Sequence, residues 1–168
     1  SYITIKPENR EEFFKNIDAD LNKRLIIFAP AGNLLSGDDG ETATILQRAL
    51  KDGRIPENMQ FLVRNHPQNP ADISGLGNDL NFIIDNPGIS FGGNIKANEL
   101  DEKSIWHLIC SLYYSDLIIT VNTSLVLDGI IFNKPQIIIA FDGCRQRPYL
   151  ESVRRYHDED NMKAFIET

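Results

Sequence analysis

The sequence predicts an α/β protein with an open parallel sheet and helices on both faces of that sheet. Two observations support this fold class. Several short apolar runs lack the polar alternation of a half-exposed strand, which is typical of parallel strands buried on both faces. These runs alternate along the chain with stretches of helical periodicity, which is the pattern of a Rossmann-like sheet. At 168 residues the chain is long enough for one such domain with a proper core.

Four runs have the β-branched, apolar composition of buried strands, and a fifth, shorter run is a further candidate. The four lie at residues 25–29, 59–64, 117–121 and 136–141, and the fifth lies at residues 82–84.

Helices are expected between these strands. Residues 41–52 and 102–114 carry apolar side chains at helical spacing. Residues 123–132 are so apolar that we expect this short helix to be sandwiched between the sheet and other elements. Residues 7–23 predict a surface helix that leads into the first strand, with Phe13, Phe14 and Ile17 facing inward.

Composition argues against several classes of function. The net charge of −7 leaves no basic stripe for a nucleic acid backbone. No apolar run reaches the roughly 20 residues that cross a bilayer. The two cysteines have no zinc or redox spacing, which fits a reducing cytoplasm. No DxD-like cluster stands at a strand end, so no metal is expected. No cofactor is expected either.

Polar residues directly follow the predicted strands, where ligands of open parallel sheets bind. Asn122, Thr123 and Ser124 stand where a strand passes into a helix, and free backbone N–H groups with a hydroxyl suit a phosphate there. The alternative is that Asn122 or Thr123 only caps the helix. Gly32, Asn33 and Asp142 follow other strands and are further candidates.

Three more side chains are candidates for the same site. Asp128 lies four residues beyond Ser124 and therefore on the same helix face. A carboxylate in an apolar helix needs a partner, either the hydroxyls of a sugar or a salt bridge or cap. Arg64 and His66 suit phosphate contacts, or they form a pair that stabilises the loop after their strand. His107 is expected to be structural.

The segment VRNHP at residues 63–67, followed by SDLIITVNTSLVLDGIIFNKPQII at residues 115–138, resembles a known family. It is similar to the donor-binding C-terminal domain of GT-B glycosyltransferases, in particular the CDP-glycerol glycerophosphotransferases and capsular-polysaccharide transferases of bacteria. The matching positions are Arg64, His66, Pro67, Asp116, Thr120, Ser124, Asp128 and the triplet Asn133, Lys134 and Pro135, with a weaker match at Asp142, Tyr149, Ser152 and Arg155.

The resemblance implies a role for several of these residues. His66 and Ser124 would hold the donor's diphosphate or phosphodiester, and Asp128 would contact the ribose. The chain departs from the family pattern at Asn65, where a proline is usual, and at Val121, where an aspartate is usual.

The function implied is that of a nucleotide-sugar or CDP-polyol donor-binding domain of a bacterial transferase. Such an enzyme makes cell-surface polysaccharide or a teichoic-acid-like polymer from a CDP- or UDP-linked donor. In this family the acceptor site and the catalytic base lie on an N-terminal domain. Residues 1–168 are therefore expected to be one domain of a longer, cytoplasmic transferase and to be inactive alone. The missing part would carry any peripheral contact with the inner face of the membrane.

Two alternatives belong to other classes. A UDP-N-acetylglucosamine 2-epimerase shares the fold, but usually has a pair of acids in the helix where this chain has only Asp128. A degenerate, non-catalytic module for protein contact would need exposed apolar area. The side chains expected to supply that area are Phe13, Phe14, Tyr113 and Tyr114.

Overall fold

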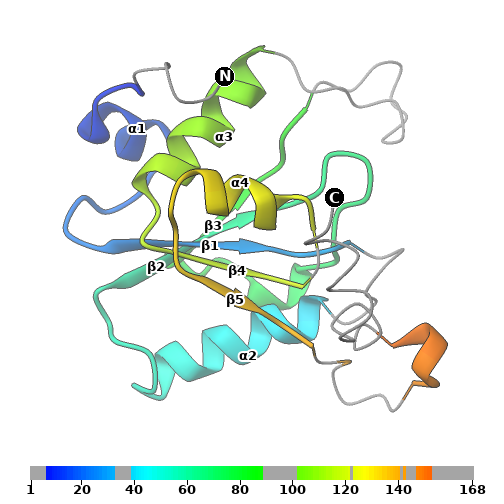
Figure 1. The fold of residues 1–168 in the computed structure, drawn as a ribbon. Helices are drawn as coiled ribbons and strands as arrows, with labels where there is room; N and C mark the ends of the chain where they lie inside the picture. The colour runs from blue at the N-terminus through cyan, green and yellow to red at the C-terminus, as the bar shows by residue number, and fades with distance from the viewer. Residues whose placement is uncertain are drawn as a thin grey trace.

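A computed structural model describes residues 7–32, 39–88, 102–121, 123–140, 142 and 147–152 of the chain. Five parallel strands form one open sheet in the order β3-β2-β1-β4-β5 (Figure 1). The strands are β1 (Arg24–Ala29), β2 (Met59–Arg64), β3 (Phe82–Asp85), β4 (Leu117–Thr120) and β5 (Gln136–Ile138). The predicted Rossmann-like α/β class is confirmed. The chain builds outward from β1 to β3, then returns to the other side of β1, so the order reverses between β1 and β4.

Helices cover both faces of the sheet, as predicted. Helix α2 (Asp39–Lys51) lies on one face, and α1 (Arg10–Asn16), α3 (Glu102–Tyr114) and α4 (Leu125–Ile131) lie on the other (Figure 1). Short 3-10 turns occur at Ser74–Leu76 and Tyr149–Glu151. Helix α1 is much shorter than the predicted helix at residues 7–23. It begins after Asn9, whose side chain accepts from the N–H of Glu11, and it ends before Asp18, which has a φ of 55°.

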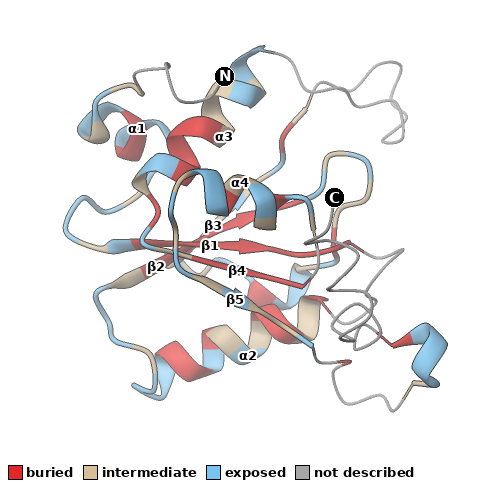
Figure 2. Ribbon diagram, in the orientation of Figure 1, coloured by how far each residue is buried: buried red, intermediate tan, exposed pale blue. Residues whose placement is uncertain are grey.

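The core alternates strictly along β1 because successive side chains point to opposite faces. Ile26 and Phe28 pack on the α2 side of the sheet, and Leu25 and Ile27 pack on the other side. Figure 2 shows the central strands buried along their length. Two parallel neighbours and two covered faces therefore explain why β1 and β2 read as continuous apolar runs.

Phe13 and Phe14 are fully buried, which confirms that they face inward. It also shows that one part of the protein-contact alternative is wrong, because neither ring can supply exposed apolar area. Tyr113, by contrast, is 51% exposed. The ring of Tyr114 stacks on Phe13 with ring centroids 5.7 Å apart. Phe13, Phe14 and Tyr114 therefore pack inside the protein and do not form the expected contact surface.

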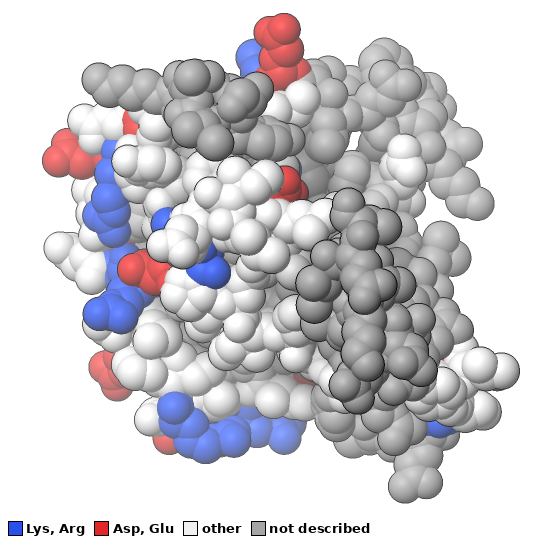
Figure 3. Space-filling model, in the orientation of Figure 1, with Lys and Arg blue, Asp and Glu red and all other residues white. Residues whose placement is uncertain are grey.

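Helix α4 is not sandwiched, so that expectation was wrong. Within the helix only Leu125 and Gly129 are buried, whereas Ile130 and Ile131 are 64% and 50% exposed. Figure 3 shows few charged side chains over the part of this face that α4 and β5 occupy. The helix packs close to the sheet at Gly129, where a Cβ would lie 2.8 Å from the side chain of Gln136. Helix α4 therefore has more apolar side chains than its contact with the sheet buries.

The two outer strands are also less buried than predicted, because each has only one neighbour. Ile84 in β3 and Ile137 in β5 are 43% and 51% exposed. Strand β5 ends at Ile138 and not at residue 141. Among the described residues, no helix is long and apolar enough to cross a membrane.

Three residues of the family-like motif lie at the amino edge of the sheet and have structural contacts. Asp116 Oδ2 accepts from the N–H of Leu25 at 3.0 Å, which joins the start of β1 to the start of β4. Lys134 Nζ donates to carbonyl oxygens at the end of α3. Asn133 has a φ of 52°, a backbone conformation that favours glycine.

Candidate functional site

A cavity of about 170 Å³ opens at the carboxyl edge of the sheet. Its walls are the end of β1, Arg64 at the end of β2 with residues 65–67 after it, Pro87 after β3, Leu108 of α3 and the start of α4. It lies beside the point where the strand order reverses, which is where open α/β sheets bind their ligands. The cavity brings together five of the side chains predicted from sequence: Arg64, His66, Thr123, Ser124 and Asp128.

Two of the other candidates, Gly32 and Asp142, are described and are not among the described residues that line this cavity. The N–H of Gly32 donates to Asp39 Oδ2 at 2.7 Å, and Asp142 Oδ2 accepts from the hydroxyl of Ser152 at 2.6 Å. Both contacts are internal to the fold. Asn33, Asn122 and Arg155 lie outside the described residues.

Ser124 occupies the N-cap position of α4, but its side chain makes no capping hydrogen bond. The hydroxyl of Thr123 lies 3.0 Å from that of Thr120, which donates to the carbonyl of Ala29 at 3.0 Å. Because Thr120 has a single hydroxyl proton, Thr123 must be the donor to Thr120. The capping alternative is therefore not realised by Thr123 or Ser124. Ser124 is left as the hydroxyl donor at the cavity, and Thr123 presents only an acceptor oxygen.

His66 is exposed at the rim, and its orientation is set by the loop that follows it. The ring Nδ1 accepts from the backbone N–H of Gln68 at 3.2 Å. A neutral histidine that accepts at Nδ1 carries its proton on Nε2. His66 can therefore donate from Nε2 to an anion in either protonation state.

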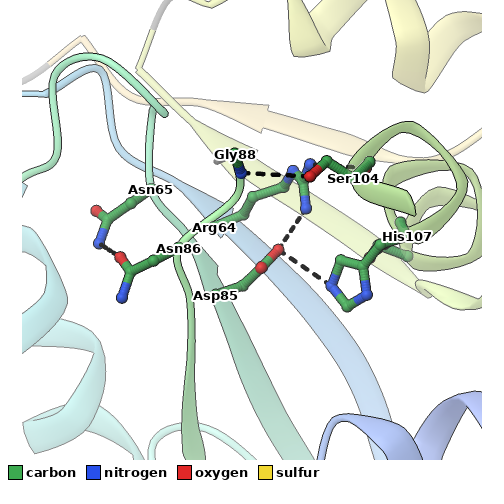
Figure 4. A network of polar contacts seen from close by, with 8 residues as sticks. Arg64, Asn65, Asp85, Asn86, Gly88, Ser104 and His107 are labelled. Atoms are coloured by element: carbon green, nitrogen blue, oxygen red, sulfur yellow. Dashed lines mark hydrogen bonds and ion pairs between the residues drawn. The ribbon is translucent and has the colours of Figure 1, made fainter. Parts of the chain in front are cut away.

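Arg64 is only 7% exposed and belongs to a buried ion-pair network (Figure 4). Its Nη1 donates to Asp85 Oδ2, and its Nη2 donates to the carbonyl of Ser104 at 3.5 Å. The same Asp85 oxygen lies 3.2 Å from His107 Nε2. Arg64 thus pairs with Asp85 and not with His66. The expectation that His107 is structural holds in part, since the ring packs on Phe13 but also contacts this carboxylate.

Two opposing effects set the pKa of Asp85. Burial works to raise it, but the contacts with His107 and Arg64 outweigh burial and hold the pKa of Asp85 below its ordinary value of 3.8. The carboxylate is therefore ionised throughout the neutral range, and it contacts two basic side chains.

Sequence reasoning missed Asp85, and a signal for it existed. The run FIID ends in an acid at a strand end, the same kind of position that drew attention to Arg64. Parallel pairing of β2 with β3 then places Arg64 opposite Asp85. Asn65 was also missed as a structural residue. Its buried amide donates to Asn86 Oδ1 at 2.8 Å and accepts from the N–H of Ala71 at 3.2 Å, which fastens the loop after β2.

Asp128 is partly buried in the cavity wall. Among the described residues its carboxylate has no hydrogen bond and no ion pair within 4.0 Å, so the salt-bridge alternative is not realised there. Burial raises the pKa of Asp128, and the nearby charge of Arg64 offsets only part of that effect. A carboxylate in this state can accept hydrogen bonds from ligand hydroxyls without first breaking an internal contact.

We expect Asp128→Asn to stabilise the protein slightly at pH 7. Because the pKa of Asp128 is raised on folding, its ionised form costs stability above the folded-state pKa. That cost disappears as the pH falls below the unfolded value of 3.8. The melting temperature should rise by up to about 2 °C at pH 7 and stay unchanged near pH 3.5. Glu57→Gln, which removes one exposed charge, is the control. A lower melting temperature for Asp128→Asn at pH 7 would contradict the expectation.

The described part of the chain contains no group of three histidine, cysteine or acidic side chains that could hold a metal ion. No protein-family model matches the chain, and no curated protein matches it. Solved structures of the wall teichoic acid polymerase TagF are similar to it. One, soaked with CDPG, is 21% identical over 89% of this chain and 31% of its own length, with a TM-score of 0.47. Another is 17% identical over 94% of this chain and 42% of its own length, with a TM-score of 0.49. The chain thus spans less than half the length of these proteins.

Proposed function

We propose that this chain is the donor-binding domain of a GT-B transferase that uses a nucleotide-activated sugar or polyol. The donor would be CDP- or UDP-linked, and the product would be a cell-surface polysaccharide or teichoic-acid-like polymer. One observation carries the proposal: a single cavity at the carboxyl edge collects a guanidinium, an imidazole, a hydroxyl and a carboxylate from two distant segments. These are Arg64, His66, Ser124 and Asp128.

The four side chains divide into two chemical roles. Arg64, His66 and Ser124 are hydrogen-bond donors, two of them able to carry positive charge, and suit the oxygens of a diphosphate. Negative charge develops on the leaving nucleotide during transfer, and fixed donors of this kind stabilise it. Asp128 is an acceptor and suits the hydroxyls of a ribose or sugar.

The size of the cavity limits how much of the donor it holds. Its volume of about 170 Å³ is below the roughly 300–1,000 Å³ of sites that enclose a whole small molecule. It suits a diphosphate and part of one adjoining ring. The rest of the donor would face a second, N-terminal domain, which would also supply the acceptor site and the catalytic base.

Isothermal titration of the chain with CDP, UDP, CMP and GDP tests the proposal. One nucleotide should bind with a micromolar to millimolar Kd, and His66→Ala and Ser124→Ala should each weaken it about tenfold or more, as expected for hydrogen bonds to a charged ligand. Asn58→Ala is the matched control, because Asn58 is exposed just before the opposite end of β2. The proposal fails if no nucleotide binds either this chain or the two-domain protein that contains it, or if both variants bind as tightly as the control.

A further inference from the structure

We propose that Asp85 and His107 are positioning residues for the donor site. Asp85 orients the guanidinium of Arg64 at the cavity wall, and His107 sets, by its charge, how strongly Arg64 attracts the donor's phosphates. This inference rests on the proposed function and adds two residues and a pH dependence to it.

The geometry separates Arg64 from its two supporting side chains. Arg64 lines the cavity, whereas Asp85 and His107 line hollows elsewhere on the surface and are not among the cavity residues. Neither side chain lines the cavity, and the contacts of Asp85 join both of them to Arg64, which does. Figure 4 shows Asp85 between the Arg64 and His107 side chains, with both contacts made to the carboxylate.

The two contacts of Arg64 fix the plane of its guanidinium. Asp85 accepts from Nη1 and the carbonyl of Ser104 accepts from Nη2. A guanidinium is a rigid planar fork with five N–H donors, so two anchors define its orientation and leave other donors for a second acceptor. A phosphate oxygen in the cavity is an acceptor of this kind.

The charge of His107 decides the net charge of the network. With a neutral His107, the positive charge of Arg64 is balanced by Asp85 alone. When His107 is protonated, the three side chains together carry one positive charge, and burial leaves that charge poorly screened. Affinity for an anionic donor should therefore fall as the pH rises and His107 loses its proton.

Among the described residues, the other charged groups near His107 belong to classes that ordinarily keep their charge across the neutral range. The ring of Phe13 packs on it at 5.6 Å between ring centroids. The charged residues that share its surface hollows are Glu8, Asp18, Asp85, Glu102 and Lys103. Carboxylate and ammonium groups ordinarily keep their charge between pH 5.5 and 8, whereas histidine changes charge there.

The experiment measures donor affinity against pH with CDP-glycerol and UDP-glucose as the probes. Their diphosphodiester groups lack the second ionisable proton of a phosphate monoester, so the ligand's phosphate charge stays constant. The chain has three histidines, so the background His66→Gln/His157→Gln leaves His107 as the sole one. This background should bind more weakly than the parent chain. Its affinity should nevertheless fall roughly fivefold between pH 5.5 and 8, the lower end of typical coupling between two sites.

Adding His107→Gln should abolish the pH dependence and fix the affinity at the weak value of the background at pH 8, because glutamine stands in for the neutral ring. Adding Asp85→Asn should reduce the pH dependence, because the carboxylate that contacts both His107 and Arg64 is lost. A purely structural role for either residue would leave the profile in place. Should Asp85→Asn fail to fold, His107→Gln, whose parent side chain is 30% exposed, still decides the question.

The outcomes distinguish this inference from the proposed function. An unchanged fivefold pH dependence in the His107→Gln variant overturns the positioning role and leaves the donor site intact. A pH-independent affinity in the His66→Gln/His157→Gln background would also overturn the positioning role and leave the donor site intact. Failure of both the parent chain and the two-domain protein that contains it to bind either donor at any pH overturns both.

Discussion

Replacing Arg64 with methionine is expected to lower the free energy of unfolding by about 3 kcal/mol and to abolish nucleotide binding. Methionine keeps the apolar stem but leaves the carboxylate of Asp85 buried without its guanidinium, and breaking a buried ion pair in this way typically costs about 3–5 kcal/mol. The lower end is expected because His107 still contacts the carboxylate. Urea unfolding measures the first effect and nucleotide titration the second.

The double variant Arg64→Met/Asp85→Asn separates the two effects. With both charges removed, most of the lost stability should return, because no unpaired charge is buried. Nucleotide binding should not return, because the proposed donor site uses the guanidinium itself. A single Arg64→Met variant as stable as the parent chain would show that the buried pair contributes nothing.

At acid pH, the difference in unfolding free energy between the Arg64→Met variant and the parent chain should disappear. The pKa of Asp85 is lowered on folding, so its contribution to stability is fully present above the unfolded value of 3.8. It is lost as the pH falls through the folded-state pKa. The gap in unfolding free energy should therefore be full near pH 6 and shrink steadily below pH 3.8. A gap that stays constant down to pH 2.5 would mean that the Arg64 variant acts by packing alone.

Replacing Gly32 with alanine is expected to lower the free energy of unfolding by about 3 kcal/mol. Gly32 has a φ of +86°, which L-residues rarely adopt and which costs of order 1–3 kcal/mol to force on them. An alanine Cβ would also lie 2.0 Å from the backbone oxygen of Asn69, and a backbone atom cannot simply rotate away. Thermal and urea unfolding measure the loss.

Gly53→Ala is the matched control. Gly53 also has a positive φ, +70°, but nothing lies within 4 Å of an added Cβ, so only the backbone strain of about 1 kcal/mol is expected. The difference between the two variants isolates the close approach of the chain at Gly32 to Asn69. Equal losses for both would show that the segment at Gly32 shifts to make room. The close approach of the backbone to Asn69 is therefore a sufficient reason for a glycine at position 32, without any contact to a ligand.

The sequence by itself determined the fold class and the main composition of the cavity. The runs in β1 and β2 are apolar throughout because both of their faces are covered, and that pattern distinguishes them from half-exposed strands. Parallel strands share one carboxyl edge, so polar residues that follow separate strands meet there. The sequence alone could therefore place four side chains at one edge: Arg64, His66, Ser124 and Asp128.

The tertiary structure alone decided which side chains support that site and which apolar residues stay exposed. Periodicity reports local geometry, but the contact between Arg64 and Asp85 depends on the register of β2 with β3. The contact of His107 with the same carboxylate depends on where α3 packs over the sheet. Likewise, an apolar helix such as α4 is buried only as far as the sheet extends, and β5, with one neighbour, is its edge. Register and coverage are long-range properties, and for that reason composition at any one segment could not supply them.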